Sequence, residues 1–400
     1  MSYKNKSSKK KNSGCGCWML LLLVGFGVWL APRVRFVDSV EGELFSLDNA
    51  GEVVGDIRQG DRSAAPAIDY SPSIAHTPTA EVAVPVVQSS ADNEAPVAWP
   101  TLPAEWADKE MRGIYLSRYM ATNRASEQMI RDRVRYYKAQ GINTIIHGVW
   151  GNGCTMYKSE VMMQTLGYSS CPNQFQEGWL DWLIDEAHKQ GMQVHAYFEK
   201  GIKLDKNSPI FDLAVEKKWF VPGIDRTYAG VDHYLLDVEK PEVAKYFHAI
   251  QAEFVRKYPE IDAVQWDDYL GYHEELAGGV DRTKALTRFA KGLRNAVKQT
   301  NPKVSFDVCH HNPYWGKRYF DADWKNWDID RAFIQVYNDE NFEEEMGYVS
   351  QVQGIAVSDA QFGRLDEIAK DARIESVFLF PSNGNPEETV ARFAQAAGIK

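Results

Sequence analysis

The sequence from about residue 110 to residue 400 alternates short β-rich runs with amphipathic helical segments. This alternation is typical of a parallel sheet whose strands are joined by helical crossovers. Eight candidate strands can be counted, and eight strands suit a closed (β/α)8 barrel, also called a TIM barrel. An open doubly wound sheet is the alternative, but no Gly-rich phosphate-binding loop follows the first strand. The candidate strands are residues 113–117, 144–150, 193–199, 263–268, 304–308, 332–337, 354–357 and 376–380.

The segments between these strands follow the periodicity expected of helices that pack on a sheet. Residues 126–140 and 179–190 each end just before a glycine, Gly141 and Gly191, and glycine is a common helix stop. Residues 241–258 begin with a proline in the first helical turn, where its missing N–H group is not needed. These patterns predict helices between the strands and support the barrel.

The first 37 residues have the pattern of a membrane-targeting segment. Residues 1–16 carry five lysines and no acidic residue, and the chain from Cys17 to Ala31 carries no charge. Two interpretations fit: an uncleaved membrane anchor over residues 17–37, or a signal peptide cleaved after Ala31, which would give a secreted protein. Pro32 directly after that site disfavours cleavage, so we favour the anchor. By the positive-inside rule the basic tail is then cytoplasmic, with the rest of the chain in the periplasm of a bacterium, attached to its inner membrane.

Residues 38–109 form an extracytoplasmic linker in this interpretation, because the stretch from 61 to 108 is rich in Ala, Pro, Ser and Val. Its prolines favour extended conformations, and a tether of this length can hold a domain on the order of 50 Å from the membrane. The sequence is therefore divided into a basic tail (1–16), an anchor (17–37), a linker (38–109) and a barrel (110–400).

The net charge of −10, without basic stripes, disfavours a nucleic-acid partner, because an acidic surface repels phosphates. No cofactor is indicated. The adjacent His310 and His311 belong to no HExxH or similar ligand set, so no catalytic metal is expected. Aromatic residues make up 12% of the chain, and their faces suit sugar rings as well as protein cores. The aromatic content is therefore compatible with a polysaccharide partner but does not single it out.

Three cysteines, Cys154, Cys171 and Cys309, lie beyond the anchor and permit at most one disulfide. Cys154 and Cys171 are the natural pair, because both lie in one predicted loop. Three buried thiols are the alternative.

Barrel enzymes carry their active-site residues at the carboxyl ends of the strands and in the loops that follow. Glycoside hydrolysis needs two carboxyl groups across the scissile bond, one proton donor and one nucleophile or base. The predicted fourth strand ends with Asp267 and Asp268, and the third ends with Glu199. Because successive strand residues point to opposite faces, we expect Asp267 to point into the mouth and Asp268 to support a loop or helix N-terminus. Glu199 is the candidate proton donor, with Asp267 as the nucleophile or base, and the alternative for Glu199 is a buried ion pair with Lys200 or Lys203.

Further polar and aromatic residues converge on the same rim and are candidates for substrate binding. His195, Tyr197 and Glu199 alternate along one strand and so share a face, which we expect to be the barrel interior. The alternative for His195 is a hydrogen-bonded core histidine, and for each aromatic candidate it is packing in the core. The candidates are Trp150, Asn152, His195, Tyr197, Trp266, Tyr269, Asp307, Asn312, Trp315 and Tyr337.

Several strings occur in a fixed order: Arg112-Gly-Ile-Tyr115, Asn143-Thr-Ile-Ile146 followed by Tyr157-Lys-Ser159, Val194-His-Ala-Tyr-Phe198, Leu236-Asp-Val-Glu-Lys-Pro-Glu-Val243, Asp262-Ala-Val-Gln-Trp-Asp-Asp-Tyr269 and Gln335-Val-Tyr337. In this order they resemble the glycosyl-hydrolase-like family 10 barrels over nearly all of residues 110–400. The resemblance implies a (β/α)8 fold and cleavage of bacterial glycans, including peptidoglycan strands. It also implies that the Asp-Asp-Tyr motif of the family falls on Asp267, Asp268 and Tyr269. Tyr115 stands where relatives often have Trp, which leaves the substrate open.

Four functions compete at this point. The first is a membrane-anchored glycoside hydrolase that cleaves peptidoglycan strands, and the second is a hydrolase of an exopolysaccharide such as poly-N-acetylglucosamine. The third is a catalytically silent barrel that binds glycan, and the fourth is a transferase that remodels glycans at the same site. A retaining and an inverting mechanism differ in carboxylate separation, which a sequence does not give.

Overall fold

The structure, a computed structural model, describes residues 96–117, 124–171, 176–226, 232–273, 276–382 and 384–400. The predicted basic tail and membrane anchor, and most of the predicted linker, lie outside the described residues. Within the described part, no helix is both long enough and apolar enough to cross a membrane.

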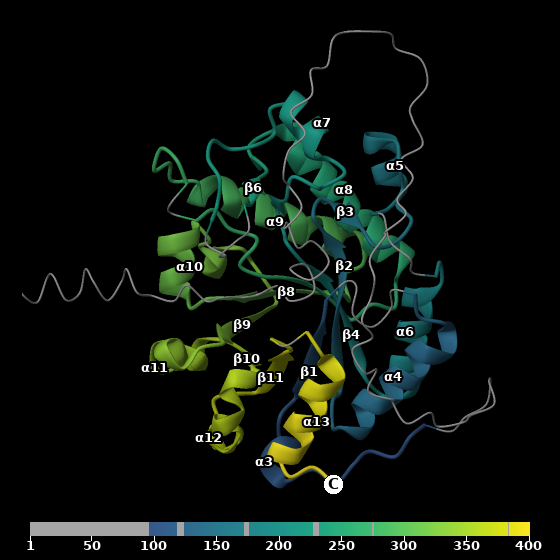
Figure 1. Ribbon diagram of the computed structural model, residues 1–400. Helices are drawn as coiled ribbons and strands as arrows, with labels where there is room; N and C mark the ends of the chain where they lie inside the picture. Colours follow the sequence, from purple (N-terminus) through teal and green to yellow (C-terminus); the bar gives the residue numbers. More distant parts are fainter. Residues whose placement is uncertain (1–95, 118–123, 172–175, 227–231, 274–275, 383) are drawn as a thin grey trace, which may run out of the picture.

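In the described chain, eight parallel strands close into a barrel with helices around it (Figure 1). The ring closes because β1 pairs with both β2 and β11. This confirms the predicted (β/α)8 architecture, and each predicted strand end lies within about two residues of the observed one, the usual uncertainty of such boundaries. The strands are β1 (Met111–Leu116), β2 (Thr144–Gly151), β4 (Gln193–Phe198), β7 (Ala263–Trp266), β8 (Ser305–His310), β9 (Arg331–Val336), β10 (Gly354–Ser358) and β11 (Ser376–Phe380).

The three predicted helices are confirmed as α4 (Glu127–Ala139), α6 (Trp179–Lys189) and α8 (Pro241–Lys257). At the start of α4 the Ser126 side chain accepts a hydrogen bond from the backbone N–H of Met129, which satisfies one of the free donors of the first turn. The later helices are α9 (Thr283–Thr300), α10 (Pro313–Phe320), α11 (Phe342–Met346), α12 (Leu365–Lys370) and α13 (Pro386–Ala396).

The loops after β2 and β4 are long and carry structure of their own. In Figure 1 their short elements gather at the upper end of the barrel, whereas α3 (Ala104–Ala107) and the C-terminus lie at the opposite end. This upper end holds the carboxyl ends of the strands, so the loops surround the mouth where we expect the active site. Their elements are β3 (Cys154–Thr155), α5 (Glu160–Leu166), β5 (Lys203–Leu204), α7 (Phe211–Glu216) and β6 (Tyr234–Leu235).

The segment just before β1 packs on the barrel. The backbones of Thr101 and Lys400 form two hydrogen bonds, of 2.6 and 3.1 Å. The buried Trp106 of α3 makes an edge-to-face contact with Phe393 of α13, with ring centroids 4.9 Å apart. The folded body therefore begins before residue 110, within the stretch that the sequence assigned to the linker.

Side chains alternate between two cores along the strands, except at an irregularity of β2 between Gly148 and Trp150. Outward-pointing side chains pack against the helices in a large cluster, and inward-pointing ones fill the barrel. The interior is tightly packed at Gly113, where an added Cβ would lie 2.5 Å from the Phe378 ring and 2.6 Å from Ile146. The interior cluster consists of Met111, Tyr115, Ile146, Tyr197, Cys309, Phe333, Ala356 and Phe378.

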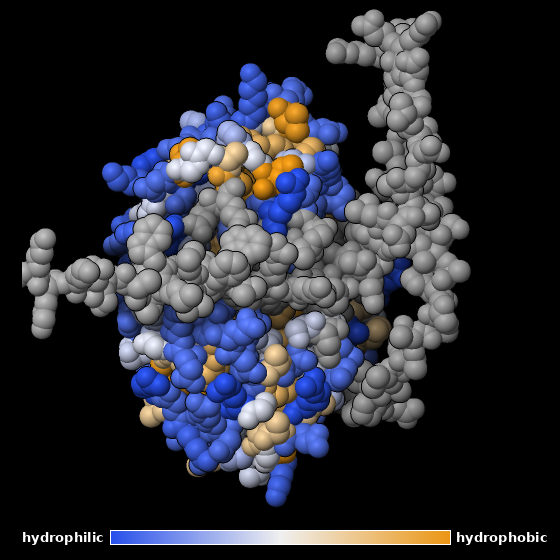
Figure 2. Space-filling model, turned by 60° about the vertical axis from the view of Figure 1, so that its left-hand side comes forward, coloured by the Kyte–Doolittle hydropathy of each residue, from blue (hydrophilic) through white to orange (hydrophobic). Residues whose placement is uncertain are grey.

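The surface on the face shown in Figure 2 is mostly hydrophilic, with small hydrophobic patches between charged side chains. Scattered exposed apolar residues are normal on a globular surface and do not by themselves mark an interface. The exposed large hydrophobic residues of the described chain are Trp99, Met129, Met163, Val215, Val280 and Tyr314.

Candidate active site

Asp267 and Asp268 follow β7 directly and lie together at the mouth of the barrel. Each is 4% exposed. The prediction that Asp268 points away from the mouth is wrong, because its Oδ1 accepts a 2.9 Å hydrogen bond from Nε2 of Gln335, an inward-pointing residue of β9. The alternation of side chains holds only within a strand, and β7 ends at Trp266, before both aspartates. Both carboxyl groups therefore face the barrel interior, Asp267 toward Tyr197 and Asp268 toward Gln335.

Asp267 is held by two donors. The Tyr197 hydroxyl donates to its Oδ2, and the backbone N–H of Tyr269 donates to its Oδ1 over 3.0 Å. Burial, followed by the negative charge of Asp268 and more weakly that of Glu199, raises the pKa of Asp267 well above the ordinary value of an aspartic acid. The site therefore favours a protonated carboxyl group beside other acids, which is the state that a proton donor requires.

Glu199 follows β4 and is also buried. Its Oε1 accepts a 2.8 Å hydrogen bond from the hydroxyl of Ser117, the residue after β1. The neighbouring lysines form ion pairs with other acids, Lys200 with Asp205 over 2.7 Å and Lys203 with Asp225 over 2.8 Å. Because its charge acts on Asp267, Glu199 stays a candidate for the second carboxyl group.

The floor beneath the acids consists of tyrosine and glutamine side chains. The Tyr115 hydroxyl donates to Oε1 of Gln265 over 2.6 Å, and the rings of Tyr115 and Tyr197 meet edge to face with centroids 5.3 Å apart. Tyr337 is partly exposed, and its ring lies 5.3 Å from that of Phe380. Tyr197 and Tyr337 thus lie where the sequence placed them, near the acids at the mouth.

His195 and Asp307 do not lie at the mouth. Both are fully buried near the opposite end of the barrel, where the Arg331 guanidinium donates to Asp307 over 2.7 and 3.1 Å. Arg331 Nη2 also lies 3.4 Å from His195 Nε2, and burial together with this positive charge holds the pKa of His195 well below its usual value. Their prediction as substrate-binding residues is wrong, because Asp307 is the third residue of β8, before the carboxyl end. For His195 the core-histidine alternative is correct.

Trp150 and Trp266 point outward and are completely buried between the strands and the helices. Trp150 donates from Nε1 to the carbonyl oxygen of Gly201 over 3.0 Å, and Trp266 stacks on Phe198 with centroids 4.9 Å apart. Their prediction as sugar platforms is wrong, because both occupy outward-pointing strand positions.

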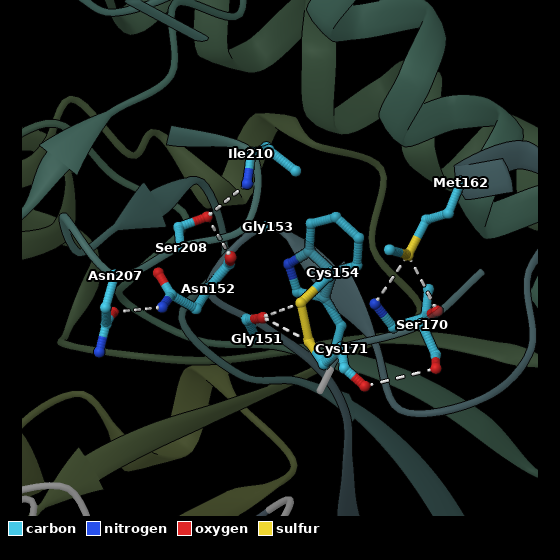
Figure 3. The surroundings of a disulfide bond; sticks show 12 residues. Gly151, Asn152, Gly153, Cys154, Met162, Ser170, Cys171, Asn207, Ser208 and Ile210 are labelled. Atoms are coloured by element: carbon cyan, nitrogen blue, oxygen red, sulfur yellow. Dashed lines mark hydrogen bonds between the residues drawn. A yellow bond between two sulfur atoms is a disulfide. The ribbon is translucent and has the colours of Figure 1, made fainter. Parts of the chain in front are cut away.

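Asn152 joins the loop after β2 to the loop after β4, as Figure 3 shows. Its side chain accepts a hydrogen bond from the backbone N–H of Asp205 and donates one to Asn207, and its carbonyl oxygen accepts one from Ser208. Its φ of 52° is in the left-handed region, which asparagine tolerates better than most residues. Asn152 therefore shapes the rim by linking two loops.

The remaining candidates form the rim itself. Tyr269 is partly exposed, and the Lys203 ammonium group lies 4.7 Å from its ring centroid. Asn312 is buried and caps α10, because its Oδ1 accepts a hydrogen bond from the backbone N–H of Trp315 over 2.9 Å. Trp315 is partly exposed beside His311, with ring centroids 6.0 Å apart. Tyr269 and Trp315 thus offer aromatic surface, whereas Asn312 positions the helix.

Sequence reasoning missed Ser117, Gln335 and Glu345 as parts of the site. Gln335 lies two residues before Tyr337 in β9, so strand alternation was a signal that placed both on the inner face. Glu345 is one of three consecutive glutamates in α11, and nothing in the sequence separates it from its neighbours. In the described part of the chain, no group of three or more His, Cys, Asp or Glu side chains is arranged to hold a metal ion.

The disulfide between Cys154 and Cys171 is present, and Cys309 is a free buried thiol. This confirms the pairing that the sequence favoured. Figure 3 shows the disulfide beside Gly151 at the end of β2.

Residues 110–281 match the family model described as Glycosyl hydrolase-like 10. Glycosyl hydrolase DigH of Escherichia coli K12 is 27% identical over 210 residues, which cover 48% of this chain and 46% of that protein. The match thus spans about half the length of that relative, and the Shigella flexneri protein of the same name gives the same values. The family match supports the resemblance over residues 110–281, the part of the chain that contains the Asp267-Asp268-Tyr269 segment, and indicates a glycoside-hydrolase-like, carbohydrate-active barrel.

Among solved structures, the GH20 exo-β-N-acetylglucosaminidase of Vibrio harveyi has a TM-score of 0.50 at 9% identity, covering 72% of this chain and 54% of that one. The GH36 α-galactosidase AgaA of Geobacillus stearothermophilus has a TM-score of 0.44 at 16% identity, covering 74% and 42%. At 9% identity, the likeness to the Vibrio harveyi structure concerns the fold alone.

Proposed function

Because residues 110–281 match the glycosyl hydrolase-like 10 family, we propose that this protein is a membrane-anchored glycoside hydrolase that cleaves a bacterial amino-sugar glycan, the peptidoglycan strand. The observation that carries the proposal is the pair of buried aspartates at the barrel mouth, one of them with a raised pKa. Such a pair combines a protonated and an ionised carboxyl group, the combination that glycoside hydrolysis uses.

Asp267 is the proton donor in this proposal, and not the nucleophile or base that the sequence suggested. Its pKa is raised by burial and by the acids beside it, so the carboxyl group keeps its proton at a pH where an exposed aspartate has lost it. Protonation of the glycosidic oxygen lets the leaving sugar depart as a neutral alcohol, while positive charge develops on the remaining sugar ring. The second carboxylate, which stabilises or attacks that ring or activates water, comes from Asp268 or Glu199.

The rim supports a sugar polymer as the substrate. Tyr269, Trp315 and Tyr337 each expose part of an aromatic ring, and the apolar C–H faces of sugar rings pack on such surfaces. The long loops after β2 and β4, tied together through Asn152, form one wall of the mouth.

The anchor at residues 17–37, with the barrel in the periplasm, belongs to the same proposal. The basic tail before a charge-free run supports this orientation, and the disulfide suits an oxidising compartment such as the periplasm. A periplasmic barrel on a tether would meet the cell wall.

The test is incubation of the purified full chain with denuded peptidoglycan and, separately, with deacetylated poly-N-acetylglucosamine, followed by mass analysis of the products. We expect fragments from peptidoglycan strands. Fragments from the exopolysaccharide alone would assign the second candidate substrate. If the protein binds glycan but releases no fragments, the barrel binds glycan without cleaving it, and the hydrolase proposal is wrong.

A further inference from the structure

His311 and Glu345 form a pair at the rim that the proposed acid chemistry does not use. His311 follows β8, and Glu345 belongs to α11 after β9. Glu345 is 1% exposed, and its Oε1 lies 3.2 Å from Nδ1 of His311. Its Oε2 accepts a 2.9 Å hydrogen bond from the backbone N–H of Asn312, so the carboxylate is fixed on both oxygens. A buried acid that fixes one nitrogen of an imidazole sets the tautomer and the direction of the other nitrogen.

The rest of the His311 environment fixes its ring. Phe320 of α10 stacks on the imidazole with centroids 5.1 Å apart and planes 23° apart, and Trp324 donates to the His311 carbonyl oxygen over 3.1 Å. The side chain is nevertheless 23% exposed. Within the described residues, Nε2 of His311 is neither hydrogen-bonded nor among the buried polar atoms that lack a partner. A preoriented imidazole thus presents one nitrogen to an external ligand.

The charges around this ring come from four elements. Glu345 of α11 and Asp268 after β7 favour the imidazolium, whereas burial and the Lys203 ammonium group of β5 oppose it. His310, with its ring centroid 5.9 Å away, is buried and has a pKa of about 3, so it carries no charge at neutral pH. The combined effect of the acids exceeds that of burial and Lys203, so the pKa of His311 lies above its usual value. The strands β7 and β8 are neighbours, with Trp266 opposite Val308, so His311 follows the strand next to the one that leads to Asp268.

We infer that His311 contacts the substrate directly, with Glu345 as its positioning residue, and donates a hydrogen bond from Nε2 to a glycan oxygen bound beside Asp268. The inference rests on the proposed function and deepens it, because it adds a donor that neither the sequence motif nor the family match identifies. Nδ1–H is committed to Glu345, so only the imidazolium offers a second N–H group. The donor is present below the raised pKa of His311 and is lost as the pH rises through it.

The test compares His311→Gln and Glu345→Gln with the full chain by kcat/KM on denuded glycan strands across pH. His188→Gln is the matched control, because His188 forms a 2.9 Å pair with Asp262, which lies before β7 and so away from the mouth. We expect His311→Gln to lower kcat/KM by about 10- to 100-fold, the usual effect of losing one hydrogen bond from a charged group. Glu345→Gln should move the alkaline limb of the profile to lower pH. His188→Gln should change neither the value of kcat/KM nor the position of that limb. If His311→Gln stays within twofold of the unaltered protein at every pH, the inference is wrong.

A binding measurement separates this inference from the hydrolase proposal. In the Asp267→Asn variant, β-1,4-linked N-acetylglucosamine hexamers should shift the NMR signal of His311 and leave that of His188 in place. A shift of the His311 signal, without any turnover by the unaltered protein, would support the contact of His311 with glycan and contradict the hydrolase proposal. Normal turnover without a shift would support the hydrolase and contradict the role of His311.

Discussion

At the scale of single residues, the protonation of Asp267 is set by its surroundings. Burial is the largest cause of its raised pKa, and the charge of Asp268 is the next. A proton donor works only while protonated, so activity should fall as the pH rises through this pKa.

Replacing Asp268 with asparagine tests this dependence. The amide keeps the size of the side chain and removes the charge, so the pKa of Asp267 should fall. The alkaline limb of the kcat/KM profile should then move to lower pH. Asp366→Asn, at an exposed position on α12, is the control that should leave the profile in place. An unmoved limb, or one at higher pH, would contradict the coupling.

The cluster of Asp307, Arg331 and His195 makes a separate prediction about stability. Asp307→Leu leaves the Arg331 guanidinium without its buried partner and should lower the free energy of unfolding by roughly 3 to 5 kcal/mol. Adding Arg331→Met should recover much of that loss, because no unpaired charge then remains. Urea denaturation measures the free energy of unfolding of the single and the double variant. The activity per folded molecule should persist, because the cluster is remote from the mouth. A double variant less stable than Asp307→Leu would contradict this reading.

At the scale of elements, the disulfide between Cys154 and Cys171 closes a loop at the rim (Figure 3). The two cysteines are separated by 17 positions in the sequence, and closing a loop of similar length stabilises a protein by about 3 kcal/mol. A reductant should lower the denaturation midpoint of the unaltered chain and leave that of the Cys154→Ser/Cys171→Ser variant unchanged. Cys309→Ala should respond to the reductant like the unaltered chain, because Cys309 is free. A midpoint that does not respond to the reductant would contradict a stabilising disulfide.

The strands and helices of the barrel were predictable because their periodicity is local. The loops at the rim were less predictable from the sequence. The β5–β6 pair spans two residues on each strand, too few for a pattern, and depends on contacts between loops. The orientation of Asp268 was mispredicted because the end of β7 is set by tertiary structure. Trp266 was mispredicted because its outward register was not weighed, and Trp150 because an irregularity of β2 between Gly148 and Trp150 turns it outward. Asp267, Tyr197 and Tyr269 were predictable, since strand ends and the motif both indicated them.

At the scale of the whole molecule, the two ends of the barrel are different. The acids and the long loops occupy the carboxyl ends of the strands, whereas the paired backbones of Thr101 and Lys400 lie at the other end (Figure 1). In the proposed arrangement, a tether that joins the barrel at that end would leave the mouth facing away from the membrane.

The proposed anchor predicts how the molecule fractionates. The full chain should remain in the membrane fraction after high-salt washing, and a variant that starts at residue 96 should be released with the same specific activity. High salt separates a hydrophobic anchor from electrostatic adsorption, because it screens only the latter. A truncated protein that still sediments with membranes would contradict an anchor within residues 17–37.

The central claim is that Asp267 supplies the proton for cleavage of a glycan at the barrel mouth. The most direct measurement is the rate of fragment release from denuded peptidoglycan by Asp267→Asn, alongside its affinity for the same strands. The asparagine can keep both contacts, accepting from the Tyr269 N–H group and donating to the Tyr197 hydroxyl, so binding should persist. We predict a rate about 10²- to 10⁴-fold below that of the unaltered protein, with affinity changed by less than about threefold. A variant that binds the strands and releases fragments at the unaltered rate would contradict the claim.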